Sequence, residues 1–565
     1  MEINFNNLSK EHSKILNQIW EDGINDFNEF YDSEILQYSN DLNYLLSGAA
    51  TRDVYLNKIY ESICYIKFLR KIKREEEEGE GVRTVIIKNL TIAKVLKGDP
   101  ELKDIRVIFP IKQVIKEIVS IPALYTLSIY RMIKEFILVR FYVTKHEIPN
   151  DLILLDSFLV ESSFLEGEFT DLYYPGLQDS IQNKPKVFYL FTILVKKYRV
   201  SLLKLRNSNV KFIHRFQFLK LFDLWIVVIL PLTLLKHLYK QNLVFQNINI
   251  TKSFRYELIR TSVLSSILNS MLNYRFIYRL KQKKVGIEKF IDWFENQQID
   301  RGFALGLKKF YEDSPYYGCL GSVPIASQFH LFPTEKEFEK KMVPGYIFLV
   351  GQSFISDYSE YCKNLKLDTM PAFRYTHLFC ENGEKHLKEV TNSGRFEILV
   401  TLPIELNQIL KILRIVKNIQ ISLTTGFKFY LKFHPVYSMN NIENFLKKNN
   451  FLEFPILEGN VGECLQGKHL LISSTSSTCL ESMASGIPVL VVTSNDGVTH
   501  LPFSENITKE IWALCYDELD VMKEIHRFSA GYDYDHFQHI AKRIKKESFT
   551  KLDSFSLERF TNFVF

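Results

Sequence analysis

The feature that most constrains this sequence is a regular alternation of short apolar runs and helical segments between residues 396 and 492. The apolar runs are Phe396–Leu402, Phe427–Phe433, 470–472 and Val489–Val492. The last two are unalternating and β-branched, as in parallel strands that are covered on both faces. The pattern predicts a doubly wound α/β domain that binds its ligand beyond the carboxyl ends of the strands.

A series of hydroxyl side chains follows the third predicted strand. Residues 473–478 read Ser-Ser-Thr-Ser-Ser-Thr and lead into a helix. Hydroxyls and free backbone N–H groups at a helix N-terminus can bind phosphate, and we expect Ser476, Ser477 and Thr478 to do so. Glu481, one turn later, could accept hydrogen bonds from a ribose. The alternatives are a capping cluster without a ligand and an acid favoured by the helix dipole.

His434 and Pro435 end the second predicted strand. Proline cannot continue the ladder, so the chain turns there and holds the imidazole at the rim of the sheet. A rim histidine can donate to the same phosphate as the serines. The alternative is a strand-ending turn without a ligand.

Composition and cysteine usage limit the number of domains and the class of protein to which the chain can belong. With 565 residues, of which 46% are hydrophobic, the chain can bury two or three cores. Seven cysteines form no CxxC pair, which indicates reduced thiols and a cytoplasmic protein, and the N-terminus lacks the order of a secretory signal. No zinc site and no DxD pair placed for a metal is visible, so we expect neither a metal nor a cofactor.

The positive charge gathers in one region. Between Asp179 and Glu257 the only acid is Asp223, whereas lysines and arginines are frequent. We expect this basic region, within a helical insertion at residues 184–284, to contact an anionic membrane surface. The alternative is a solvated helix face. No motif supports nucleic acid as the partner.

An apolar run at residues 224–235 is the strongest membrane signal. A spanning helix needs about 20 apolar residues, and this run is bounded by Asp223 and Lys236 and broken by Pro231. We expect a buried core helix first and an interfacial helix second, with no transmembrane segment.

Two groups of motifs carry a family resemblance. His434-Pro435, Ser476-Ser477, Glu481 and Gly486-Ile-Pro488 resemble the donor-binding half of GT-B glycosyltransferases, among them bacterial sialyltransferases and polysialyltransferases, capsule Kdo transferases and teichoic-acid polymerases. Trp293-Phe-Glu-Asn-Gln297 resembles a segment of bacterial surface-carbohydrate biosynthesis proteins. The resemblance covers residues 396–494 and, more loosely, 287–494.

The resemblance implies a GT-B-like α/β fold, with two Rossmann-like domains facing a cleft and added N-terminal helices. We expect an N-terminal helical segment at 1–82 and an acceptor-side domain at 83–392 that begins with strands at 83–89 and 151–156. A nucleotide-sugar-binding domain follows at 393–506. Helices at 507–565 would pack back on the N-terminal domain.

The resemblance also implies roles for residues. His434 and the serine pair would bind the phosphate of a sugar nucleotide, which is CMP-linked in the HP-motif families, without a metal and with inversion. The base of those sialyltransferases lies in an acid-acid-Gly motif, which here matches only Glu77-Glu78-Gly79 in an acidic run. Glu295, at the end of an apolar segment, is the candidate base instead. The acceptor-side candidates are Asp156, Asn296, Gln297 and His330.

We therefore expect a glycosyltransferase of surface polysaccharide (capsule or lipopolysaccharide) biosynthesis, acting on a glycan or lipid-linked acceptor and peripheral at the inner membrane face. Two alternatives stay open. One is a CDP-polyol phosphotransferase of the teichoic-acid type. The other is a non-catalytic nucleotide-sugar-binding component of a polysaccharide assembly complex.

Overall fold

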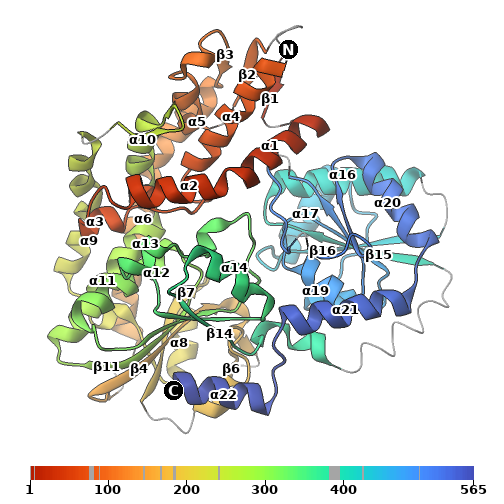
Figure 1. Cartoon of the computed structure of the whole chain (residues 1–565). Helices are drawn as coiled ribbons and strands as arrows, with labels where there is room; N and C mark the ends of the chain where they lie inside the picture. The colour runs from red at the N-terminus through yellow and green to blue at the C-terminus, as the bar shows by residue number, and fades with distance from the viewer. Residues whose placement is uncertain are drawn as a thin grey trace.

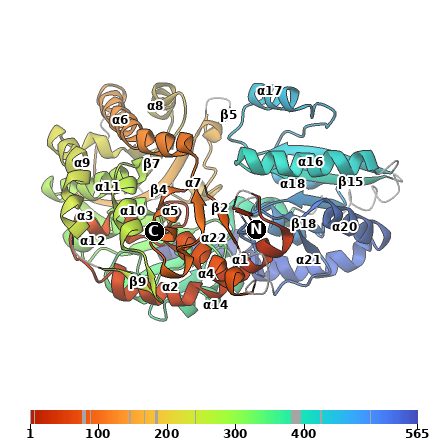
Figure 2. The same ribbon diagram turned by 90° about the horizontal axis from the view of Figure 1, so that it is seen from above.

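A computed structural model describes residues 2–5, 7–75, 82–87, 89–143, 147–165, 168–181, 186–239, 242–380, 395–422, 426–494, 497–504 and 506–565. The chain forms two lobes that lie side by side (Figure 1), and a view from above separates them again (Figure 2). Each lobe contains one large parallel sheet.

The first lobe is built on a seven-stranded sheet with the order β14-β13-β12-β11-β4-β7-β8, in which every neighbouring pair is parallel. Its strands are β4 (Asp151–Val160), β7 (Val187–Leu194), β8 (Phe212–Ile213), β11 (Gly286–Trp293), β12 (Tyr316–Leu320), β13 (Tyr346–Leu349) and β14 (Lys366–Thr369). The connecting helices include α7 (Leu177–Ile181), α8 (Tyr198–Asn207), α12 (Gln298–Phe310), α13 (Glu335–Glu339) and α14 (Ser353–Tyr361).

The second lobe is built on a five-stranded parallel sheet with the order β16-β15-β17-β18-β19. Its strands are β15 (Phe396–Leu402), β16 (Phe427–Phe433), β17 (Leu470–Ser473), β18 (Val489–Val492) and β19 (Trp512–Cys515). Its helices are α16 (Leu406–Ser422), α17 (Met439–Asn449), α18 (Val461–Leu465), α19 (Thr478–Ala484), α20 (Glu518–Ala530) and α21 (Tyr534–Ser548). The predicted fold class, two Rossmann-like domains in a GT-B-like arrangement with added N-terminal helices, is confirmed.

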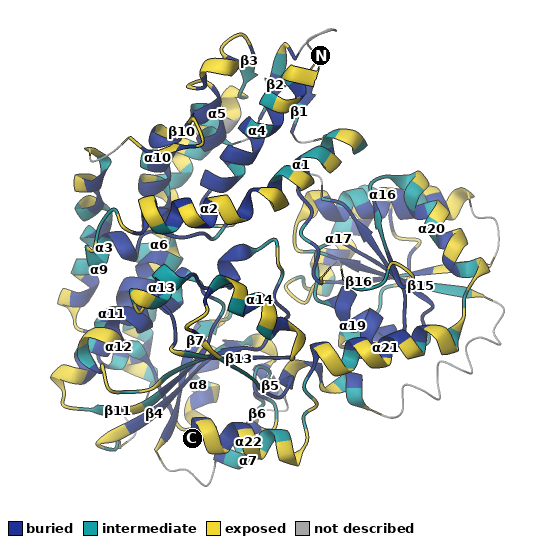
Figure 3. Cartoon of the chain, viewed as in Figure 1, coloured by how far each residue is buried: buried dark blue, intermediate teal, exposed yellow. Residues whose placement is uncertain are grey.

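The N-terminal helices form a third body against the first lobe. They are α1 (Lys10–Asp22), α2 (Ile24–Phe30), α3 (Leu42–Leu45), α4 (Ile59–Glu75), α5 (Leu90–Leu96) and α6 (Ile111–Tyr142), joined later by α9 (Leu221–Thr233), α10 (Thr251–Ser262) and α11 (Ser265–Gln282). One hydrophobic cluster fills this body and one face of the large sheet, while another continues from the large sheet into the second lobe. Figure 3 shows buried residues concentrated in the strands of the two large sheets and on the inner sides of the helices that pack around them.

A buried ionic cluster ties the N-terminal helices to the first lobe. Arg52 Nη2 lies 2.8 Å and Arg301 Nη2 lies 2.5 Å from the two oxygens of Glu337, and all three side chains are buried. Burial alone would raise the pKa of Glu337, but the two guanidinium groups hold it below its ordinary value. The cluster therefore keeps a carboxylate ionised inside the protein.

Three predicted boundaries are wrong. The strand expected at 83–89 is short, and β2 (Thr84–Ile86) pairs with β1 (Glu2–Asn4) and β3 (Arg106–Ile108) in a separate small sheet. The region 184–284 is not a helical insertion, because β7 and β8 belong to the large sheet. A strand buried on both faces lacks the alternation that would distinguish it from a buried helix.

The third correction concerns the C-terminus. The second domain does not end at 506, since β19 pairs with β18 and completes its sheet. The chain returns to the first lobe after α21, where the amide of Thr550 donates to the carbonyl oxygen of Val350 at 2.7 Å. α22 (Ser554–Val564) continues this contact, and the ring of Phe563 packs against Tyr317 and Tyr346. Arg559 forms an ion pair there with Asp368.

Candidate functional site

The carboxyl ends of the second sheet bring two predicted motifs to one edge. β16 ends at His434 and β17 runs into the serine series, with β15 between the two strands. Two strand spacings separate them, or about 10 Å. His434 and the serines therefore belong to one candidate site, as the sequence predicted.

The serine series divides by burial. The hydroxyl of Ser473 is buried and accepts a hydrogen bond from Thr401 at 2.7 Å. Ser476 and Ser477 are partly exposed. Ser476 Oγ lies 2.8 Å from the hydroxyl of Thr478 and accepts from the Thr478 amide at 3.3 Å. Ser477 donates to Glu481 at 3.3 Å.

The expected helix N-terminus is weaker than predicted. α19 has 7 residues, and Ser477, at its N-cap, makes no capping hydrogen bond. The dipole of so short a helix adds little. The hydroxyl side chains of Ser476 and Ser477 are therefore the groups that this loop offers to a ligand.

Glu481 is held from two sides. Its side chain is buried, and besides the bond from Ser477 its Oε2 lies 3.2 Å from Nε2 of His377. His377 belongs to the 3-10 segment η8 (Phe373–Phe379), which follows the last strand of the first lobe. Glu481 thus contacts Ser477 and His377, and its expected role toward a ribose stays a prediction.

Tyr375, also on η8, lies against the same group. Its hydroxyl accepts a hydrogen bond from the backbone of Val323 at 3.3 Å. Burial raises the pKa of Tyr375 to about 12, while Arg374 and a hydrogen bond with Ser477 oppose the shift. Tyr375 remains a neutral phenol beneath the serine pair.

His434 is exposed at the rim. Its Nδ1 accepts from the Val436 amide at 3.2 Å, which leaves Nε2–H as a donor toward a ligand. Partial desolvation and then the charges of Lys432 and Arg374 lower the pKa of His434. The imidazole is therefore neutral at pH 7 and still able to donate.

Arg374 links the two lobes electrostatically. Its guanidinium lies 5.7 Å from the ring centroid of Tyr173. Burial raises the pKa of Tyr173, Arg374 lowers it, and Glu295 raises it again. Glu295 of the first lobe, Tyr173 and Arg374 are therefore close neighbours. Sequence reasoning missed Arg374, Tyr375 and His377, because they lie on an irregular segment with no motif.

Glu295 is partly buried at the end of β11. Trp293 Nε1 donates to one of its oxygens at 3.2 Å, and Gln297 Nε2 donates to the other at 2.8 Å. These two bonds fix the carboxylate in one orientation. Gln297 is therefore a neighbour of the candidate base.

The other acceptor-side candidates are not at the rim. Asn296 has φ +48° and is buried, and it donates to the carbonyl oxygen of His330 at 2.7 Å. His330 is buried as well. Asp156 lies within β4 rather than at its end, and burial together with Asp300 raises its pKa well above the ordinary value. The strand continues to Val160, since a protonated aspartate can remain inside the core.

A cavity of about 260 Å³ lies between the second lobe and the N-terminal helices. Ser474, Thr475 and Pro403 line it from the sheet edge, and Tyr55 and Lys58 line it from the helices. The first half of the serine series therefore faces the N-terminal body, whereas Ser477 and Glu481 face η8.

Among the described residues, no group of three or more His, Cys, Asp or Glu side chains is arranged to hold a metal ion.

Comparison with known proteins yields only a loose likeness of fold. No protein-family model and no curated protein matches the sequence. A solved structure of S. aureus MnaA with UDP covers 73% of this chain and 96% of its own, at 11% identity and a TM-score of 0.40. A UDP-GlcNAc 2-epimerase from Neisseria meningitidis, bound to UDP-GlcNAc, covers 73% and 99%, at 10% identity and a TM-score of 0.42.

The wall teichoic acid polymerase TagF with CDPG covers 78% of this chain and 96% of its own, at 10% identity and a TM-score of 0.38. All three values of the TM-score are low. The assignment of the fold therefore rests on the two parallel sheets and their strand order.

Proposed function

We propose that the protein is a glycosyltransferase of bacterial surface polysaccharide biosynthesis, for capsule, lipopolysaccharide or a related glycan. In this proposal it transfers a sugar from a nucleotide sugar to a glycan or lipid-linked acceptor. The observation that carries it is the convergence of His434, Ser476 and Ser477 at one sheet edge, with Arg374 and His377 added by η8. These groups are donors or cations suited to a phosphate.

The catalytic contribution of this edge would be to stabilise the departing nucleotide. Charge develops on the leaving phosphate as the glycosidic bond breaks, and preset donors act on it without reorganising. His434 would supply Nε2–H, and Arg374 would supply a fixed positive charge. No step in this proposal needs a metal.

Glu295 is the proposed base. Its carboxylate, oriented by Trp293 and Gln297, would take the proton of the acceptor hydroxyl as that oxygen attacks the anomeric carbon. A base opposite the leaving group gives inversion. The sequence resemblance favours a CMP-linked donor.

The acceptor and the location belong to the same proposal. A glycan or lipid-linked acceptor would reach the candidate site from the side of the first lobe, where Glu295 lies. Such acceptors are assembled at the inner membrane face, so we place the protein in the cytoplasm, peripheral to that membrane.

The test separates transfer from binding. Thermal unfolding is followed with CMP, CDP, UDP or GDP, and the stabilising nucleotide names the donor class because a ligand stabilises by RT ln(1 + [L]/Kd). Donor hydrolysis or transfer is then assayed with the corresponding sugar nucleotide. Binding without either reaction would favour a non-catalytic component, and turnover of a CDP-polyol would favour a phosphotransferase. No stabilisation by any nucleotide would overturn the proposal.

A further inference from the structure

α6 lies on the outside of the N-terminal body (Figure 2), and exposed apolar side chains form a stripe along it. Ile115, Val119, Tyr130 and Ile137 recur at helical spacing and are exposed, and Phe141, near the end of the helix, is 77% exposed. The helix spans Ile111–Tyr142, or about 48 Å at 1.5 Å per residue. A soluble protein rarely leaves so long an apolar surface open to water.

α9 and the 3-10 segment η6 (Leu234–Tyr239) extend this surface. The hydroxyl of Tyr125 on α6 donates to the carbonyl oxygen of Val228 on α9, so the two elements are in contact. The stretch Leu221–Tyr239 is long and apolar enough to cross a membrane, by length and composition only, and 33% of it is buried. Trp225 is 58% and Tyr239 87% exposed.

The expectation of a buried core helix at residues 224–235 holds for one side of the helix, where Leu224, Val227, Leu230 and Leu234 are buried, and is wrong for the side that carries Trp225. Its inner side is fixed, since Asp223 is buried and lies 2.6 Å from Arg275 and 2.7 Å from Arg279 of α11. The outer side carries Phe222, Trp225 and exposed leucines. This is the geometry of a helix that lies along an interface.

Cations border the apolar stripe. Five basic side chains on α6 are exposed, and the basic residues of α8 continue the border: Lys112, Lys116, Arg131, Lys134 and Arg140 on α6, and Arg199, Lys204 and Arg206 on α8. The one acid between Asp179 and Glu257, Asp223, faces inward in its ion pairs. The outer face is therefore apolar with a positive edge.

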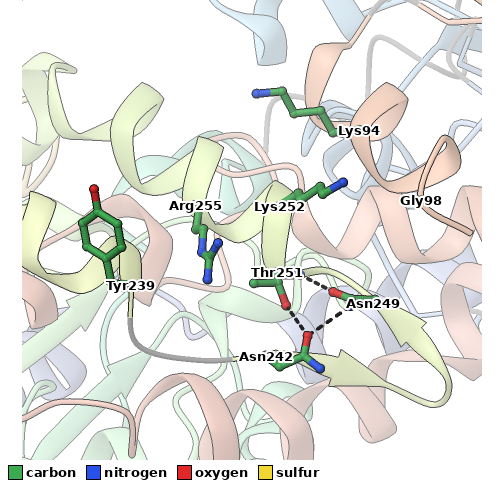
Figure 4. A pocket seen from close by; sticks show the side chains of 8 residues that line it. All are labelled: Lys94, Gly98, Tyr239, Asn242, Asn249, Thr251, Lys252 and Arg255. Atoms are coloured by element: carbon green, nitrogen blue, oxygen red, sulfur yellow. Dashed lines mark hydrogen bonds between the residues drawn. The ribbon is translucent and has the colours of Figure 1, made fainter.

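A basic pocket of about 510 Å³ lies at one end of this face (Figure 4). Lys94 of α5 and Lys252 and Arg255 of α10 line it, together with Tyr239 from the end of η6. Figure 4 shows the guanidinium of Arg255 between Tyr239 and Thr251.

The start of α6 adjoins the same pocket. Glu117 of α6 accepts hydrogen bonds from Tyr256 of α10 at 2.9 Å and from the amide of Leu90 of α5 at 3.2 Å. Lys94 Nζ lies 3.8 Å from the ring centroid of that Tyr256. Both bonds come from neutral donors, and among the described residues Glu117 forms no ion pair with Lys94, Lys252 or Arg255.

We propose that the exposed faces of α6, α9 and η6, named here the α6–α9 face, dock on an anionic lipid bilayer, with a lipid phosphate in the pocket of Lys94, Lys252 and Arg255. Apolar side chains would enter the acyl boundary, while the bordering cations meet the headgroups. A second copy of the chain would not match this face, because two positive edges would meet.

Tryptophan fluorescence tests the insertion directly. The chain has four tryptophans. Trp20, Trp293 and Trp512 are at most 3% exposed, so Trp225 alone is open to lipid. Adding phosphatidylcholine vesicles that contain about one third phosphatidylglycerol should shift the emission to the blue, whereas pure phosphatidylcholine should not. Trp225→Phe should keep vesicle binding and lose the shift.

Co-sedimentation tests the charge. Lys252→Glu/Arg255→Glu should weaken binding to the anionic vesicles about tenfold or more, and Trp225→Ser should weaken it as well. The matched controls, Lys542→Glu/Arg543→Glu on α21 and Phe555→Ser on α22, are exposed elsewhere and should bind as the wild type does. Soluble glycerol phosphate should not displace the protein from the anionic vesicles in the same co-sedimentation assay, at concentrations that leave the vesicles intact.

Several results would overturn the proposal. They are an unchanged emission with anionic vesicles, equal binding by the charge-reversal and control variants, or a dimer in sedimentation velocity that Trp225→Ser dissociates.

The proposal does not depend on the nucleotide site. Nucleotide binding in solution without vesicles should be the same in the Lys252→Glu/Arg255→Glu variant, so failure of one proposal leaves the other testable.

Discussion

Nε2 of His377 lies 3.2 Å from Oε2 of Glu481, and this contact joins the segment that leaves the first lobe to the helix that follows the serine series. The two residues are 104 positions apart in the sequence. Glu481 also accepts from Ser477, so one buried carboxylate positions a histidine and a serine at the same place. The contact makes η8 part of the candidate site.

His377→Ala should weaken nucleotide binding. If the imidazole contacts the donor phosphate, its loss removes a charge-assisted hydrogen bond worth about 1.5–3 kcal/mol, or roughly ten- to a hundredfold in Kd. Titration calorimetry with the stabilising nucleotide measures the change. His539→Ala, an exposed histidine on α21, is the matched control. Equal affinity in the two variants would remove His377 from the site.

Gly462→Ala should act through the same histidine without touching it chemically. A Cβ at Gly462 would lie 2.5 Å from Cδ2 of His377, so the ring must move. We expect weaker nucleotide binding with little change in the free energy of unfolding. Gly345→Ala is the control, because nothing lies within 4 Å of the added Cβ. Wild-type affinity in Gly462→Ala would show that the position of the His377 ring does not matter.

Glu295→Gln should separate binding from transfer. Its neighbours Trp293 and Gln297 can still donate to the amide oxygen, so the fold and the nucleotide affinity should be preserved. Loss of the base should lower kcat by about 10²–10⁴. Steady-state transfer kinetics measure it, with Glu360→Gln, an exposed carboxylate on α14, as the control. A wild-type kcat would exclude Glu295 as the base.

Asp156 and Asp292 predict a pH dependence of stability. Burial raises the pKa of both carboxyl groups well above the ordinary value, and the charge of Asp300 adds to the shift of Asp156 while the charge of Asp156 adds to that of Asp292. A carboxyl group with a raised folded-state pKa stabilises fully below its unfolded pKa, and that stability is lost as the pH rises toward the folded pKa. Asp156→Asn should therefore gain stability over the wild type between about pH 5 and pH 8, by at most about 1.4 kcal/mol per pH unit.

Urea unfolding at both pH values measures this difference, with the exposed Asp313→Asn as the control. The same difference from wild type at both pH values would mean that Asp156 does not titrate in this range.

Glu337→Gln should destabilise the protein strongly. It leaves Arg52 and Arg301 buried without their carboxylate, and breaking a buried pair costs about 3–5 kcal/mol. Thermal unfolding should show the loss, while Glu339→Gln on the exposed side of α13 should unfold like the wild type. A small effect would mean that the N-terminal helices are held to the first lobe by apolar packing alone.

Much of the second lobe could be predicted from the sequence, because its strands are short, apolar and separated by amphipathic helices. β15, β16 and β18 have the predicted bounds, and His434 and Ser476 stand at the same edge. β7 could not be recognised, since Val187–Leu194 is apolar apart from Thr192 and lies among basic residues typical of exposed helices. The spacing of apolar residues alone does not distinguish a strand that is buried on both faces from a buried helix.

The site was predicted only where residues follow a strand. Asp156 resembled a strand end because an acid after four apolar residues is expected at a rim, yet burial keeps it protonated inside β4. Arg374 and His377 belong to an irregular segment. Their importance depends on the charge of Arg374 acting on His434 and on the contact of His377 with Glu481, and both partners are distant in sequence. Such contacts carry no local pattern.

The central claim is that His434, Ser476 and Ser477 bind the phosphate of a nucleotide sugar. Titration calorimetry of the nucleotide that stabilises the wild type, repeated with His434→Ala and with Ser476→Ala/Ser477→Ala, tests it most directly. We predict that each variant keeps the wild-type melting temperature without ligand and loses at least about tenfold in affinity. Unchanged affinity in both variants would contradict the account.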